Sequence, residues 1–300
     1  MALVMIEKIE ICDLCGKEVS SNGRVIAKGL FDRYGVKSKI NIMMCKYCKY
    51  IFQYEKFDYK TLSFLYEQDG AAVSVAIFNK PVMHLENIKK RQAFISEAIC
   101  LASIPDNKKL NILDVGGGDG EITEHLVSRG RVYLADVNSR DPVNPEIIKV
   151  AKLFDEADFS EKFDVIIMNH VLEHVFSPTE FLRRANSLVT DQGVVIVEVP
   201  FELYTPLSGR TGDWKHVAYF STNVLCNFLR KTGFDPIYVK LCTGYYETRK
   251  LAVIRAVARK MTISTAPVDC KSGYLQLLLD SFNIRALPLY LSAQLRKLLP

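Results

Sequence analysis

The chain has 300 residues, of which 49% are hydrophobic and 24% are charged, and its formal net charge is +5. This composition is typical of a globular protein and excludes intrinsic disorder and collagen-like repeats. The charge is divided unevenly, with +4 in residues 1–60, −6 in residues 61–239 and +7 in residues 240–300. Since the largest segment is acidic, a nucleic-acid-binding protein is not expected.

The N-terminal 60 residues are rich in turn signals and contain two Cys-x-x-Cys pairs 29 residues apart. Two such pairs supply the four thiolates of a closed tetrahedral zinc site. We therefore predict a small zinc-binding domain over residues 1–60, in which the metal stabilises the fold and performs no chemistry. Its predicted ligands are Cys12, Cys15, Cys45 and Cys48. The other cysteines stand singly and are interpreted as buried apolar residues.

Residues 61–105 have apolar residues at helical spacing and are predicted to form a helical linker, part of which is a candidate lid. No apolar run reaches the roughly 18 residues of a membrane span. The first eleven residues lack the features of a secretory signal, so a cytoplasmic protein is expected. Residues 261–300 are predicted to form a mainly helical tail.

Strands and helices alternate over residues 106–260, which predicts a parallel sheet covered by helices on both faces. The predicted strands are 111–115, 131–135, 147–150, 163–168 and 194–199, with a closing pair at 236–242 and 251–257. Helices are predicted near 121–128, from 178 and over 222–231. Ser177 and Glu180 fit a capping box, with Pro178 at the first helical position.

The strongest chemical signal is the sequence DVGGGDG at 114–120, where an apolar strand runs into a glycine turn. Glycines at alternate positions let a ligand lie against the backbone. The turn also contains carboxylates, which would repel a diphosphate and suit a ligand with a cationic portion. The next strand ends at Asp136, whose carboxylate is suited to a ribose.

These segments resemble the class I S-adenosylmethionine (SAM)-dependent methyltransferases. The resemblance covers about residues 106–260 and includes DVGGGDG, Asp136, FDVIIMNHVLEHV at 163–175 and GVVIVEVP at 193–200. It implies a Rossmann-like α/β fold whose sheet has seven strands, the last of them antiparallel. The predicted SAM-binding residues are Asp114, Gly116, Gly118, Gly120, Asp136 and Asn169.

Two histidines are candidates for the base that removes a proton from the methyl acceptor. His174 follows the fourth strand, and Glu173 beside it is a further catalytic candidate. His216 lies in the long loop 201–221, a length that is usually functional inside a compact domain. The same loop contains Trp214, and its side chains suit a polar ring-shaped ligand. There are two alternatives. His174 is a structural residue that Glu173 orients, or Trp214 and Tyr219 anchor the loop while His216 caps the following helix.

The four-cysteine segment followed by a SAM domain is similar to a bacterial group of sugar methyltransferases that includes nucleotide-sugar C-methyltransferases. The stretch around His216 matches that group at His216, Tyr219 and Ser221, and departs from it at Asp213 and Lys215. This similarity implies a sugar or nucleotide-sugar as the small-molecule substrate. An RNA methyltransferase with a zinc ribbon and a non-catalytic SAM-binding protein are the alternatives.

Overall fold

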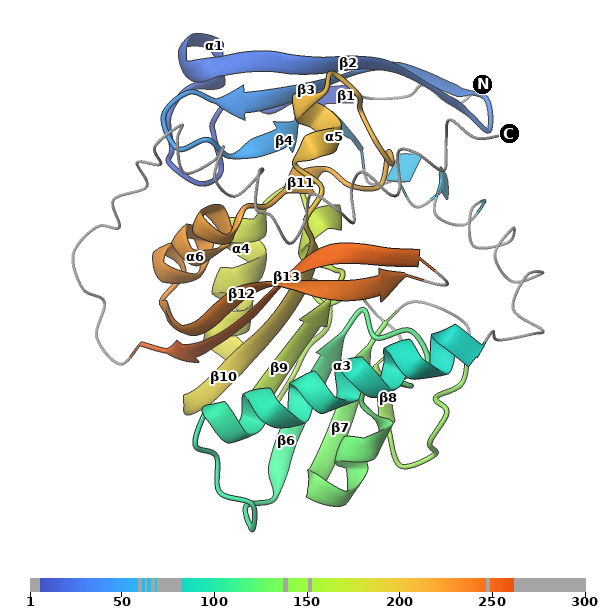
Figure 1. Ribbon diagram of the computed structural model, residues 1–300, viewed down its shortest axis with the longest axis vertical. Helices are drawn as coiled ribbons and strands as arrows, with labels where there is room; N and C mark the ends of the chain where they lie inside the picture. Colours follow the sequence, from blue (N-terminus) through green and yellow to red (C-terminus); the bar gives the residue numbers. More distant parts are fainter. Residues whose placement is uncertain are drawn as a thin grey trace.

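The computed structural model describes residues 6–58, 61–62, 64–65, 68, 82–136, 140–150, 153–246 and 249–261. Most of the predicted lid, Cys270 and residues 262–300 of the predicted helical tail lie outside this part of the chain. Figure 1 shows a small group of N-terminal strands above a large twisted sheet.

The large sheet has seven strands in the order β12-β13-β10-β9-β6-β7-β8. Strands β6, β7, β8, β9 and β10 are parallel, whereas β13 runs antiparallel to both β10 and β12. The mixed sheet with an antiparallel closing pair confirms the predicted Rossmann-like architecture. Its strands are β6 (Leu110–Val115), β7 (Gly130–Ala135), β8 (Ile148–Val150), β9 (Phe163–Asn169), β10 (Val189–Pro200), β12 (Phe234–Tyr246) and β13 (Arg249–Lys260).

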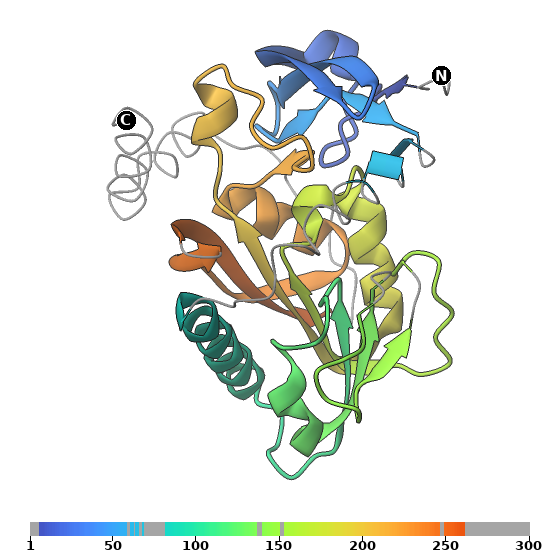
Figure 2. The same cartoon turned by 90° about the vertical axis from the view of Figure 1, so that its right-hand side faces the viewer.

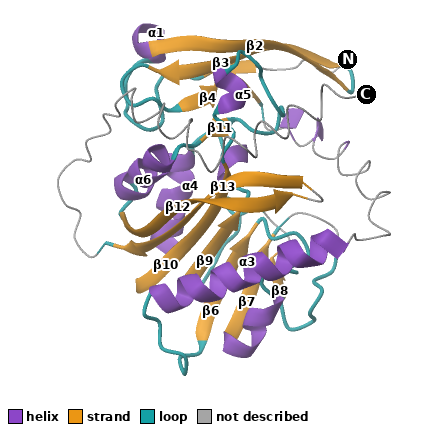
Figure 3. Ribbon diagram, viewed as in Figure 1, coloured by secondary structure: helices purple, strands orange, loops and turns teal. Residues whose placement is uncertain are grey.

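Helices cover both faces of this sheet, as Figures 2 and 3 show. Alternate residues of β10 separate into two cores, because successive side chains of a strand point to opposite faces. Val194 and Ile196 pack with α3 (Val82–Leu101), whereas Val195 and Val197 pack with α4 (Pro178–Leu188) and α6 (Thr222–Lys231). None of the helices in the described ranges is long and apolar enough to cross a membrane.

Two of the predicted helices begin where the sequence indicates, and the third has a different helix type. Ser177 Oγ accepts a hydrogen bond from the Glu180 backbone N–H at 3.3 Å, which confirms the predicted cap of α4. Ser221 caps α6 in the same way. The helix predicted near 121–128 is wrong in type, since the chain forms turns and then the 3₁₀ helix η1 (Glu124–Arg129).

The N-terminal part forms β1 (Ile6–Lys8), α1 (Val19–Asn22), β2 (Gly23–Arg33), β3 (Val36–Cys45), β4 (Ile51–Gln53) and β5 (Glu55–Phe57). A four-stranded sheet in the order β11-β4-β3-β2 takes its edge strand β11 (Ala218–Tyr219) from the loop after β10. The predicted long loop 201–221 is therefore not structureless, because it contains both β11 and α5 (Tyr204–Leu207).

The N-terminal part and the large sheet share one apolar core. The ring of Tyr50 packs edge-on against Phe228 of α6, with the ring centroids 4.9 Å apart. Asp13, between the first two cysteines, accepts hydrogen bonds from Ser177 Oγ at 3.0 Å and from the Thr179 backbone N–H at 2.9 Å. The first Cys-x-x-Cys pair is thereby attached to the N-terminus of α4.

Candidate functional site

The glycine turn after β6 has the backbone geometry that the sequence predicts. Gly116, Gly118 and Gly120 have φ angles of +66°, +67° and +80°, a region that residues with a β-carbon rarely adopt. The Gly116 backbone N–H donates to the Ala135 carbonyl at 2.9 Å, which fixes the turn to the end of β7. The turn lies at the carboxyl edge of the parallel strands, where open α/β sheets bind ligands.

Asp114 lies beneath this turn and is buried. Its Oδ2 accepts a hydrogen bond from Thr123 Oγ1 at 2.7 Å, while Oδ1 has no hydrogen-bond partner among the described residues. Burial raises the pKa of Asp114 to about 7, because the bond from Thr123 only partly compensates for lost hydration. A β-carbon on Gly117 would lie 2.2 Å from Asp114 Oδ2, so this glycine makes room for the carboxylate.

The two acids near the mouth of the turn both have partners. Asp136 Oδ2 accepts a hydrogen bond from the Gly118 backbone N–H at 2.9 Å, which ties the end of β7 to the turn. Asp119 Oδ2 lies 3.3 Å from Arg140 Nη1, and a β-carbon on Gly118 would lie 3.3 Å from Arg140 Nη2. Arg140 therefore reduces the negative charge that the sequence predicts at this turn.

The end of β9 lies beside the glycine turn. Val115 of β6 is paired with Met168 of β9, so the residues that follow each strand emerge at the same edge. A β-carbon on Gly116 would lie 3.0 Å from Val171 Cγ2, which places Val171 against the turn. Asn169 is buried, and its Nδ2 has no hydrogen-bond partner in the described part of the chain. An amide donor is thus held next to the predicted cofactor site.

A network of buried charges lies behind this edge and was not predicted from the sequence. Glu198 is fully buried, and its carboxylate accepts hydrogen bonds from Arg91 Nε at 2.9 Å and Arg255 Nε at 2.7 Å. His170 bridges two carboxylates, with Nδ1 3.1 Å from Glu173 Oε1 and Nε2 3.2 Å from Glu198 Oε1. Burial opposes the charged imidazole, but these carboxylates outweigh it and raise the pKa of His170 to about 9.

Glu173 does not orient His174 in the way that the structural alternative requires. Its Oε1 is closer to His170, whereas the distance from Oε1 to His174 Nε2 is 3.8 Å. His174 is instead oriented by its Nδ1, which lies 3.0 Å from the Lys215 carbonyl oxygen. Burial lowers the pKa of His174, since the charged ring loses its hydration.

His216 lies beside His174, although the two residues come from different loops. Their ring centroids are 5.0 Å apart, and His216 Nδ1 is 2.6 Å from Glu202 Oε2. Burial opposes protonation of His216, but the Glu202 carboxylate outweighs it and raises the pKa of the ring. His216 is not a helix cap, because Ser221 fills that place for α6. The structure therefore brings all three predicted catalytic residues together.

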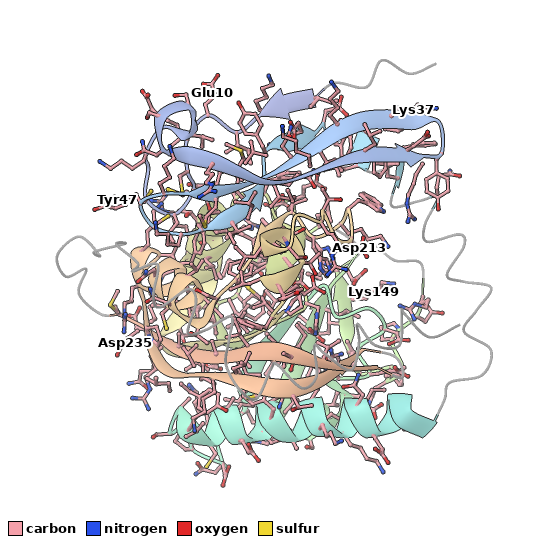
Figure 4. The ribbon with its side chains drawn as sticks, turned by 45° about the horizontal axis from the view of Figure 1, so that its top comes forward. Glu10, Lys37, Tyr47, Lys149, Asp213 and Asp235 are labelled. Carbon is pink, nitrogen blue, oxygen red and sulfur yellow. The ribbon has the colours of Figure 1, made fainter. Side chains whose placement is uncertain are left out.

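The other loop residues do not all face this cluster. Trp214 is 7% exposed and its ring packs edge-on against Phe31, with centroids 5.4 Å apart. Its predicted role in holding a ring-shaped ligand is not supported, because the indole packs against the N-terminal sheet. Asp213, labelled in Figure 4, lies between the N-terminal strands and the large sheet. Tyr219 donates its hydroxyl proton to the Thr211 carbonyl at 2.8 Å, which secures the loop.

The four N-terminal cysteines form one cluster in which the Sγ atoms lie within 4.8 Å of one another. The two short pairs, Cys12 with Cys48 and Cys15 with Cys45, have Sγ–Sγ distances of 3.6 Å. Each Cys-x-x-Cys turn is followed by a residue with positive φ, Gly16 at +69° and Lys49 at +63°. In both turns that residue's backbone N–H donates to the carbonyl of the first cysteine.

Sequence reasoning missed the residues of the buried charge network, Arg140 at the glycine turn, and Glu202 beside His216. Glu198 is the one acid in the apolar run from Val194 to Pro200, a pattern that indicates a buried ionised group with a partner. Glu202 carries no comparable signal, because only the folded loop brings it to His216.

Comparisons with known proteins identify a methyltransferase domain in this chain. The sequence model of a family described as methyltransferase domain matches residues 88–239, which is half of the chain. The ubiquinone biosynthesis O-methyltransferase of Azorhizobium caulinodans is 35% identical over 105 residues, covering 30% of this chain and 40% of that protein. The enzyme of the same name from Cereibacter sphaeroides is 27% identical over 158 residues, covering 43% and 61%. The chain thus spans less than two thirds of the length of these relatives.

A solved structure shares the fold. The 1,6-didemethyltoxoflavin-N1-methyltransferase of Burkholderia thailandensis, solved with S-adenosylhomocysteine and 1,6-didemethyltoxoflavin bound, superposes with a TM-score of 0.52. It is 15% identical, and the alignment covers 78% of this chain and 99% of that structure. At this identity the likeness concerns the fold alone.

Proposed function

This chain belongs to the methyltransferase-domain family, and we propose that it transfers the methyl group of SAM to a small polar acceptor. The observation that carries this proposal is a juxtaposition at one edge of the sheet. The glycine turn at 116–120 contacts Val171, and the cluster of Glu173, His174 and His216 begins two residues further along the chain. A methyl donor on the turn and an acceptor at the cluster would be neighbours.

The groups around the turn suit the parts of SAM. Asp136 offers a carboxylate for the ribose hydroxyls, and the glycines allow close approach of the ligand to the backbone. Asn169 contributes the Nδ2 donor described above, and Asp114 supports the turn from below. SAM itself supplies an electrophilic methyl group, so the protein has to align the acceptor with the methyl carbon and remove one proton.

His216 is the group best placed to accept that proton. Glu202 holds its Nδ1, which leaves Nε2 as the basic nitrogen and favours the imidazolium that forms. His174 is the second candidate, with its Nδ1 bound to the Lys215 carbonyl. Glu173 supplies negative charge beside both rings.

We propose a hydroxyl group as the acceptor and retain a sugar or nucleotide-sugar as its expected carrier. Relatives named as O-methyltransferases support an oxygen acceptor. The sugar is supported by the resemblance of the four-cysteine segment and of the residues around His216 to the sugar methyltransferases.

We further propose that the four N-terminal cysteines hold a structural zinc ion. Zinc–sulfur bonds of about 2.3 Å in a tetrahedron place sulfur atoms roughly 3.8 Å apart. The shortest Sγ–Sγ distances of 3.6 Å are close to this value. Four thiolates fill the coordination sphere, so the ion would stabilise the fold and leave no position for a substrate.

The variant His216→Ala tests the proposed function. It is expected to bind SAM as the wild type does while turnover falls about 10²- to 10⁴-fold, the usual contribution of a positioned base. Calorimetry measures the affinity, and transfer of labelled methyl from SAM to a panel of sugars and phenols measures turnover. His125→Ala is the matched control, because His125 contacts Ser96 rather than this cluster. Equal turnover in both variants would contradict the role of His216.

A further inference from the structure

We propose that Glu173, His174 and His216 bind a divalent first-row transition cation such as Zn²⁺, which holds the acceptor oxygen beside the methyl donor. One ligand atom from each residue lies within 4.8 Å of the other two. Two histidines and one carboxylate form a recurrent set for zinc and for non-haem iron, with further positions left open. This inference rests on the proposed function. With the cation bound, His216 is a ligand instead of the base, and the cation activates the acceptor hydroxyl in its place.

The hydrogen bonds of the two histidines leave one nitrogen of each ring for the cation. His174 Nδ1 lies 3.0 Å from the Lys215 carbonyl oxygen, which cannot donate a proton, so Nδ1 is the donor and Nε2 is the acceptor. His216 Nδ1 lies 2.6 Å from Glu202 Oε2, which fixes the same tautomer. Metal-binding histidines usually donate their second N–H to a carbonyl or carboxylate in this manner.

Glu173 supplies an independent indication of a missing ligand. Its side chain is 1% exposed, and Oε2 has no hydrogen-bond partner among the described residues. An ionised oxygen buried without a partner is costly, and a cation would satisfy it. His170 is not part of the set, because both of its ring nitrogens are held by Glu173 and Glu198.

Cation binding would tighten the cluster. Bonds of about 2.0–2.2 Å place ligand atoms roughly 3.0–3.5 Å apart, so the three side chains would move together by about 1 Å. The open positions take the acceptor hydroxyl, whose pKa the cation lowers. The hydroxyl proton leaves to water, and the bound oxygen forms a bond to the methyl carbon of SAM. The carbon–sulfur bond breaks, and its electron pair stays on S-adenosylhomocysteine.

Cobalt titration of protein whose cysteine cluster is already filled with zinc tests the proposal. The wild type is expected to bind one equivalent of Co²⁺ with visible d–d absorption and without thiolate charge transfer. Glu173→Gln, which preserves shape, and His216→Ala are expected to lose this binding, and His125→Ala to retain it. Glu202→Gln is expected to weaken it about 10- to 100-fold, as losses of such supporting bonds do.

Circular dichroism confirms that each variant is folded, and SAM calorimetry on the same samples separates this inference from the proposed function. Two results would overturn the cation site alone. In the first, the wild type binds SAM but no Co²⁺. In the second, the wild type binds SAM, and Glu173→Gln binds Co²⁺ as tightly as the wild type does. Protein that binds Co²⁺ but not SAM would instead overturn the proposed methyl transfer.

Discussion

Replacing Glu198 by alanine is expected to lower the free energy of unfolding by about 3–5 kcal/mol, the cost of breaking a buried ion pair from one side. The carboxylate is fully buried between Arg91 and Arg255, each with a side-chain exposure of 13%. These cations and His170 hold the pKa of Glu198 well below its usual range, although burial alone would raise it. In the variant, Arg91, His170 and Arg255 lose the buried carboxylate that they share, and this loss is the source of the destabilisation.

Urea unfolding of Glu198→Ala and of a surface variant measures this effect. Asp32→Ala is the matched control, since its ion pair with Lys37 has the same length of 2.9 Å but side-chain exposures of 59% and 75%. Exposed pairs contribute about 0–1 kcal/mol. A loss in Glu198→Ala no greater than that in the control would show that the buried network is not needed for stability.

Removing the proposed zinc ion is expected to unfold the N-terminal segment and to destabilise the larger part with it. Structural zinc contributes its binding free energy to folding, of the order of 10 kcal/mol in small zinc peptides. The effect should spread because Tyr50 packs on Phe228 and Asp13 binds the start of α4. Cys48→Ser, which removes a buried ligand, is the corresponding variant.

Zinc content by native mass spectrometry and thermal unfolding by circular dichroism provide the readouts. Cys100→Ser is the control, since Cys100 lies on α3, away from the cluster. The interpretation of Cys100 as a buried residue is wrong, because its side chain is exposed. We expect the zinc content of the wild type in Cys100→Ser and one zinc ion fewer per chain in Cys48→Ser. Identical zinc content and melting in the two variants would rule out the four-thiolate site.

Local patterns predicted the parts of this fold that are encoded over short stretches. The apolar strands, the glycine turn and the cap at Ser177 each depend on neighbours within a few residues. The antiparallel closing pair agreed with the family resemblance, although β12 and β13 extend further than their apolar cores. A helix was predicted near 121–128, whereas the backbone there forms 3₁₀-type bonds such as that from the Thr123 N–H to the Gly120 carbonyl at 3.0 Å.

The remaining features depend on contacts between distant residues. Glu198 and Arg91 are 107 residues apart in the sequence. No local pattern around either residue predicts that the two form an ion pair. The two-residue strand β11 forms by pairing with β4, which is distant from it in the sequence. Glu202 and His216 meet through the path of the loop between β10 and α6. The predicted charge of the glycine turn is changed by Arg140, which folds back over Gly118 from the next loop.

Calorimetric titration of the purified protein with SAM, and separately with NAD, tests the central claim that the turn at 116–120 receives a sulfonium nucleoside. We expect one SAM bound per chain, no measurable heat with NAD, and loss of SAM binding in Gly117→Val, where the added side chain collides with Asp114. Binding of NAD without any binding of SAM would contradict the account.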